Sequence, residues 1–359
     1  NTDYYSKEIY QKGKYNFDRL VENKMMIQEK SSNYYVYQLI MNGHKQTGIV
    51  GCCAIDDYFN NTIKKHELTR KDKEEDRKNH IRYSRLNYEP VFFAYPKVDD
   101  LDSIVNQIKK EETTYDFLTE DNIQHTLWTI NDSEIQIQIQ KLFKDKVPNI
   151  YIADGHHRTA AAALVGKELR DKAGGYATDG SHYNYFMAVL FPDNQLNIID
   201  YNRVVSDLNG IEPSSLLERL SEKFKITKIK ESYKPKELHH IGMYLHEKWY
   251  KLVIKEGLYD PQDPVDVLDV TILSKQILEP ILDIKDLRSN TRIDFVGGIR
   301  GIKELEKRVD SGEMKIAFAL YPVSMQQIMD ISNNNMIMPP KVTWFEPKLR
   351  SGLTVYSLS

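Results

Sequence analysis

A short strand that leads through one glycine into an alanine-rich helix constrains the fold of this chain more than any other feature. Residues 149–153 (NIYIA) have the composition of a strand, and residues 159–172 (TAAAALVGKELRDK) form a strong helix pattern that Gly174 and Gly175 end. The five residues between these elements read DGHHR. A strand followed at once by a helix is typical of α/β folds.

The remaining patterns predict both strands and helices. Strands are expected at residues 34–40, 47–54, 91–95, 185–191 and 315–322, and a turn at Gly43 joins the first two into a hairpin. Helices are expected at residues 101–112, 265–278 and 325–333. Residues 338–352 hold three prolines, so they cannot form one helix. The prediction is a mixed α/β (α+β) fold, with mixed sheets and flanking helices.

Length and charge limit the class of protein. A chain of 359 residues is long enough for two domains. Its 49 Lys+Arg against 52 Asp+Glu argue against a general nucleic-acid binder, and no apolar run reaches the roughly 18 residues of a membrane-spanning helix. The two cysteines, Cys52 and Cys53, are neighbours, which excludes a secreted disulfide scaffold and a four-cysteine zinc site. We expect a soluble cytoplasmic protein.

The DGHHR residues carry the strongest chemical signal. A helix that starts after one glycine directs its unpaired N–H groups and the positive end of its dipole at one point. Arg158 adds a guanidinium there, which can donate two hydrogen bonds to a phosphate. The pattern therefore predicts a phosphate-binding turn. In an alternative interpretation Asp154 only caps the helix, and the histidines lie on the surface. A metal site at His156 and His157 is also open, although it needs further ligands from elsewhere.

Residues 66–85 are strongly polar and open with His66-Glu67. If the segment is helical throughout, His66, Thr69, Lys73, Asp76 and His80 share one face. Such a helix usually lies in solvent. Alternatively, His66-Glu67 projects a general base or a metal-binding carboxylate from the start of the segment.

Cations and aromatic residues gather near the end of the chain. Lys341 and Lys348 stand close to Trp344 and Phe345 in a proline-stiffened segment, which suits the wall of a pocket for an anionic substrate. A plain surface loop is equally consistent with this composition. Arg203, at the end of a predicted strand, is either a pocket residue or a structural pairing group.

These segments together resemble a bacterial and archaeal family known as domain-of-unknown-function family ten-fifteen. The similar segments, in the order of the family, are residues 63–77, 151–162, 183–205, 292–298 and 338–353. The DGHHR element also resembles the phosphate-binding box of the ParB/sulfiredoxin-like fold, whose members include free-serine kinases. The resemblance implies phosphorylation of free L-serine to O-phosphoserine, with pyrophosphate suggested as donor.

The resemblance also raises an expectation about the amino terminus. Family members usually open with a longer amino-terminal stretch, and this chain starts at Asn1-Thr2-Asp3 without Met. We therefore expect part of that region, and with it a wall of the site, to be missing. Two regions are expected: a ParB/sulfiredoxin-like phosphate-binding region over residues 1–205, and an α/β region over 206–359 whose final loop returns to the pocket.

The function expected from the residues and the resemblance is that of a small-molecule phosphotransferase. Its donor would be pyrophosphate or a nucleotide, with Mg²⁺ assisting. The alternatives are a ParB-like regulatory module that binds a nucleotide and DNA, and a metal-dependent phosphohydrolase. The expected phosphate-binding residues are Gly155, His156, His157, Arg158, Lys341 and Lys348; the expected catalytic residues are Glu67, His66 and Asp154; and the expected ligands of the acceptor carboxylate are Arg77 and Arg203.

Overall fold

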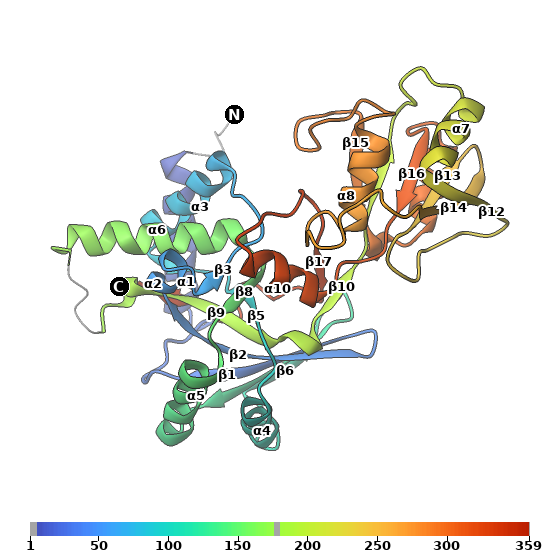
Figure 1. Cartoon of the computed structure of the whole chain (residues 1–359). Helices are drawn as coiled ribbons and strands as arrows, with labels where there is room; N and C mark the ends of the chain where they lie inside the picture. The colour runs from blue at the N-terminus through green and yellow to red at the C-terminus, as the bar shows by residue number, and fades with distance from the viewer. Residues whose placement is uncertain (1–5, 176–179, 359) are drawn as a thin grey trace. The chain divides into compact units, whose positions relative to one another are not determined.

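The computed structural model describes residues 6–175 and 180–358, which form two compact units (Figure 1). The first unit holds the chain up to Asn197 and also the segment from Pro347 onward, and the second unit is Ile198–Glu346. The expected division after residue 205 falls later in the chain, at the end of strand β11 (Tyr201–Val205). Residues 1–3, on which the expectation about the amino terminus rests, lie outside the described residues.

An eight-stranded sheet organises the first unit, in the order β3-β8-β5-β9-β2-β1-β7-β6. The pairs β3/β8 and β5/β9 are parallel and the other pairs are antiparallel, which confirms the predicted mixed sheet. Asn42 and Gly43, both with positive φ, join β1 to β2 in the expected hairpin. The strands are β1 (Tyr34–Met41), β2 (His44–Ala54), β3 (Ile63–Lys64), β5 (Val91–Tyr95), β6 (Tyr115–Leu118), β7 (Gln124–Ile130), β8 (Ile150–Asp154) and β9 (Tyr185–Pro192).

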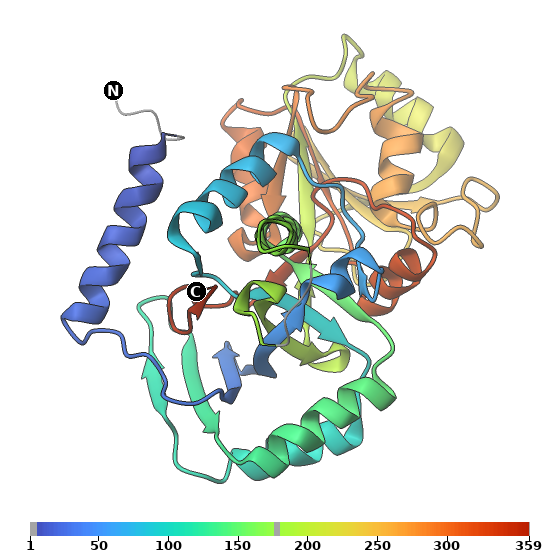
Figure 2. The same ribbon diagram turned by 90° about the vertical axis from the view of Figure 1, so that its left-hand side faces the viewer.

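Helices cover both faces of this sheet. They are α1 (Lys7–Glu22), α2 (Ile55–Phe59), α3 (Lys71–Ser84), α4 (Asp99–Ile108), α5 (Ser133–Lys146) and α6 (His156–Lys172). Figures 1 and 2 show α4 and α5 on one face, and α6 with α3 and α1 on the other. The alanines of α6 let it approach the sheet closely, so that Ala161 and Val165 share a fully buried cluster with Phe93 and Ile152.

The second unit is built on a six-stranded antiparallel sheet in the order β12-β14-β13-β16-β11-β15. Besides β11, its strands are β12 (Phe224–Ile229), β13 (His240–Leu245), β14 (Lys248–Ile254), β15 (Ile293–Gly297) and β16 (Ile316–Ala319). Its helices are α7 (Pro213–Lys223), α8 (Asp269–Leu273), α9 (Lys303–Asp310) and α10 (Met325–Asn333). Two small sheets pair β10 (Asn197–Ile199) with β17 (Trp344–Glu346), and β4 (Leu86–Asn87) with β18 (Tyr356–Ser357).

Two helix predictions need correction. The segment from residue 66 is not helical throughout: α3 starts only at Lys71, because β3 holds the chain against β8 and residue 70 is still extended. His66 and Thr69 therefore do not share a helix face with His80. The helix expected over 265–278 starts only at Asp269, because the Asp263 side chain accepts from the backbone N–H groups of Val265 and Asp266 and holds a turn there. It runs through α8 and continues as a π-helix over Ser274–Leu278. Among the described residues, no helix is long and apolar enough to cross a membrane.

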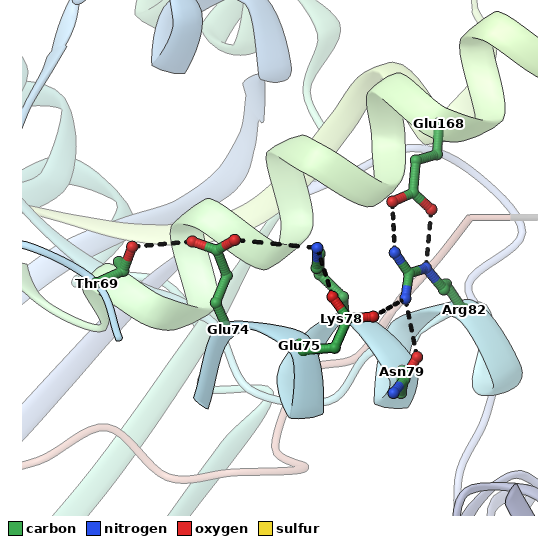
Figure 3. Close-up of polar contacts among 7 residues, drawn as sticks. All are labelled: Thr69, Glu74, Glu75, Lys78, Asn79, Arg82 and Glu168. Carbon is green, nitrogen blue, oxygen red and sulfur yellow. Dashed lines mark hydrogen bonds and ion pairs between the residues drawn. The ribbon is translucent and has the colours of Figure 1, made fainter. Parts of the chain in front are cut away.

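A chain of polar contacts holds α3 against α6 (Figure 3). Glu168 of α6 accepts two hydrogen bonds from the Arg82 guanidinium of α3, at 2.8 and 2.5 Å. At the other end, the Thr69 hydroxyl donates to the Glu74 carboxylate at 2.9 Å, just before α3 begins. The segment that carries His66 and Glu67 is therefore fixed at both of its ends, by β3 and by the first turn of α3.

A glycine pair tests how tightly α6 is packed. A Cβ at Gly166 would overlap the carbonyl of Tyr183 and lie 3.0 Å from Ile55, whereas a Cβ at Gly13 of α1 meets nothing within 4 Å. We expect Gly166→Ala to destabilise the protein by about 1–3 kcal/mol through overpacking. Gly13→Ala should stabilise it by up to about 1 kcal/mol, because alanine favours helix. Urea denaturation measures both, and equal stabilisation by the two variants would contradict this packing.

Candidate functional site

The candidate site is built on the DGHHR turn (Asp154–Arg158), where β8 passes into α6. The helix begins at His156, earlier than the predicted Thr159, and Gly155 is its N-cap with φ +98°. A Cβ at this position would lie 3.0 Å from the Arg158 guanidinium, so both the backbone angle and the space require glycine. No side chain caps the helix start. Its first N–H groups and the positive end of its dipole therefore form an anion-binding position.

Two cations meet at the Asp154 carboxylate beside this helix start. Arg158 approaches Asp154 Oδ2 at 3.3 Å, and Lys348 Nζ approaches the same oxygen at 3.3 Å. The Arg158 guanidinium also donates to the carbonyl of Pro90 at 3.0 Å and lies 3.6 Å from the Glu89 carboxylate. Lys348 is 194 residues away from Asp154 in the sequence and reaches the turn because the final segment belongs to the first unit.

His66, Glu67 and His156 lie together on the inner side of the turn. The rings of His66 and His156 make an edge contact with centroids 4.3 Å apart, and the backbone N–H of His66 donates to His156 Nε2 at 3.4 Å. A neutral imidazole that accepts at Nε2 carries its proton on Nδ1. That nitrogen lies 3.9 Å from a carboxylate oxygen of Glu67, which is beyond hydrogen-bond distance.

Burial keeps these histidines neutral. It lowers the pKa of His66 to about 4 and moves the pKa of His156 well below its ordinary value. His157 is less buried, and burial lowers its pKa as well. Its Nε2 accepts the backbone N–H of Arg70 at 2.9 Å. The histidines of the turn therefore offer hydrogen bonds rather than positive charge, and the charge for an anion comes from Arg158 and Lys348.

The same arrangement bears on metal binding. The Nε2 atoms of His156 and His157 each accept a different backbone N–H group, so their rings do not converge on one ion. Within residues 6–175 and 180–358, no three His, Cys, Asp or Glu side chains gather in a way that would hold a metal ion. A Mg²⁺ ion needs fewer protein ligands, because it binds through one or two carboxylates together with substrate phosphates.

A pocket opens beside Arg158 and is also lined by Arg77 and His80 of α3. Arg77, predicted to bind the acceptor carboxylate, therefore lies with the DGHHR turn in the first unit. Asn87 and Glu89, which were not among the residues predicted for the site, line the same pocket. One signal was present: Pro90 follows Glu89 directly and comes just before the buried strand β5, and loop residues next to such strands often line pockets.

Arg203 and Lys341 lie in the second unit. The Arg203 guanidinium is buried and donates to the carbonyl of Lys341 at 2.9 Å and to that of Tyr201. Burial lowers the pKa of Arg203 to about 9. The space that it lines is only about 10 Å³, enough for a single water. The predicted site residues that lie in the first unit are Arg77, His66, Glu67, Asp154, Gly155, His156, His157, Arg158 and Lys348.

Stability should depend on pH through His66. Its pKa is about 4 in the folded protein against an ordinary value of 6.5, so the unfolded chain binds the proton first. The stability present above pH 6.5 is then lost as the pH falls toward 4, with a slope of up to about 1.4 kcal/mol per pH unit. We expect His66→Phe to flatten this part of the curve in urea denaturation between pH 4 and 7.

The control for this experiment is His246→Asn, at an exposed turn of the second unit. It should leave the pH dependence unchanged. An unaltered slope in His66→Phe would show that His66 is accessible to protons in the folded protein.

The family model described as "Protein of unknown function (DUF1015)" matches residues 1–271. A search of curated proteins finds no match. Matches among solved structures include SbnI with a C-terminal truncation from Staphylococcus aureus, which is 12% identical with a TM-score of 0.44 over 86% of this chain and 87% of that one.

Two further solved structures show the same level of similarity. A conserved hypothetical protein from Pyrococcus furiosus is 13% identical, with a TM-score of 0.40, over 86% of this chain and 95% of that one. A free serine kinase in complex with AMP is 13% identical, with a TM-score of 0.39, over 82% of this chain and 86% of that one.

Proposed function

The chain belongs to the family described as "Protein of unknown function (DUF1015)", and from its site we propose that it is a small-molecule phosphotransferase. The observation that supports this proposal most is the meeting of Arg158 and Lys348 at the uncapped start of α6. A helix start with two adjacent cations can stabilise the charge that spreads over the oxygens of a phosphoryl group in transfer. The acceptor is a free amino acid hydroxyl, with L-serine as the first candidate.

Each part of the turn has a role in this reaction. The N–H groups of the first turn of α6 and the Arg158 guanidinium bind the phosphates of the donor, and Lys348 neutralises the charge of the leaving group. The hydroxyl oxygen of the acceptor forms a bond to the transferred phosphorus, and the bond from phosphorus to the bridging oxygen of the donor breaks. Glu67 accepts the hydroxyl proton as general base, and its half-exposed carboxylate is open to a substrate.

His66 and His156 position Glu67 and do not act on it through their charge. Both are buried and neutral, so His156 does not form an ion pair with Glu67 at neutral pH. Their contact with each other fixes the backbone just before Glu67. If Mg²⁺ assists the reaction, Asp154 would hold it, and the ion would supply further charge neutralisation.

Two substitutions and one matched control test the proposal. The reaction would be followed as O-phosphoserine formed from L-serine with ATP, ADP or pyrophosphate. We expect Glu67→Gln to lower kcat by about 10²–10⁴-fold, since a general base typically contributes this much. Lys348→Ala should raise the KM of the donor by about tenfold or more, because it removes a charged contact of about 1.5–3 kcal/mol.

Lys348 is 43% exposed, so its loss should hardly change the melting temperature. Lys167→Ala, which removes an exposed lysine on the same helix as the turn, is the control and should retain full activity. No phosphorylated product with any donor, or full activity in both site variants, would contradict the proposed function.

A further inference from the structure

A pocket of about 180 Å³ lies in the first unit beside the start of α6. We call it the Arg158 pocket. A single water needs only about 15 Å³, so this space is large enough for a ring system. Its apolar wall comes from α3, α6 and the neighbouring strands, and consists of Ile81, Leu86, Val91, Ala162, Phe186 and Met187.

Two arginines line this pocket together with the Glu89 carboxylate, which lies 3.6 Å from the Arg158 guanidinium. Arg158 is in the first turn of α6, one turn before Ala162, and Arg77 of α3 lines the pocket with it. The Arg77 side chain is exposed, and it forms no hydrogen bond or ion pair with any residue that the structure describes. A ligand of this pocket therefore has an anionic part that extends toward the turn.

One polar group in the pocket wall suits recognition of a heteroaromatic ring. Asn87 is only 7% exposed, and its Oδ1 has no hydrogen-bond partner among the described residues. A buried acceptor in this state is unfavourable unless a ligand donates to it. A carboxamide can form hydrogen bonds to both a ring nitrogen and the exocyclic amine of a nucleobase, because it carries a hydrogen-bond acceptor and a hydrogen-bond donor side by side.

We infer that the Arg158 pocket holds the base of a nucleoside phosphate, whose phosphates extend past Arg77 and Arg158 to the DGHHR turn. This inference rests on the proposed function and selects a nucleotide over pyrophosphate as the donor. Pyrophosphate has no apolar part, so it would leave the six apolar side chains and Asn87 without a ligand. The side chain of free serine is a single hydroxymethyl group, which is too small to cover the same wall.

The experiment measures the binding of ADP and of pyrophosphate to the full chain by calorimetry. Ala162→Leu adds three carbons to the pocket wall, and Ala173→Leu adds the same group at the exposed end of α6 as a control. We expect Ala162→Leu to weaken ADP binding more than tenfold and to change pyrophosphate binding less than threefold. Ala173→Leu should change neither. Adenosine should displace ADP from the unmodified protein.

Any of three results would overturn the inference: equal loss of both ligands in Ala162→Leu, unchanged ADP binding in that variant, or failure of adenosine to displace ADP. If Ala162→Leu does not fold, Met187→Phe fills the same pocket from β9 and should have the same effect. None of these measurements needs turnover. If Ala162→Leu selectively loses ADP binding but the protein transfers no phosphate, only the proposed function is contradicted. If the protein transfers phosphate from pyrophosphate and Ala162→Leu binds ADP unchanged, only the inference about the Arg158 pocket is contradicted.

Discussion

The positive φ of Gly155 is the constraint on which the candidate site depends. It turns the chain from β8 directly into α6, so that Asp154 ends the strand and His156 already starts the helix. The turn is therefore too short for a side-chain cap, and the Arg158 guanidinium lies against Gly155. Any other residue at this position would need both a strained backbone and the space that Arg158 occupies.

Desolvation decides which groups of the turn can carry charge. His66 and His156 lie edge to edge inside the first unit, and their burial holds both in the neutral form near pH 7. The half-exposed Arg158 and Lys348 stay close to the carboxylate of Asp154. The positive charge for a donor phosphate thus comes from Arg158 and Lys348, while the buried histidines position the segment before Glu67.

The sequence predicted the parts of this arrangement that depend on neighbouring residues. Gly155 and the alanines after it indicated a strand, a tight turn and a closely packed helix, and the mixed α/β class is confirmed. The start of α3 could not be located from the sequence, because the pairing of β3 with β8 keeps residues before Lys71 extended and no local pattern reports that pairing. Asn87 was missed for a similar reason, since its surroundings come from residues far away in the sequence.

The final segment of the chain connects these distant parts. Pro347 accepts a hydrogen bond from the buried Gln46 at 3.0 Å, which anchors the segment next to Lys348. Further on, Tyr356 of β18 pairs with Asn87 of β4, and the backbone N–H of Leu358 donates to the carbonyl of Arg85 at 2.9 Å. This returning segment, Pro347 to Leu358, therefore places both the cation at Asp154 and the carboxamide in the Arg158 pocket. Because the two ends of this segment are held separately, the spacing between Lys348 and Asn87 is fixed by the first unit itself.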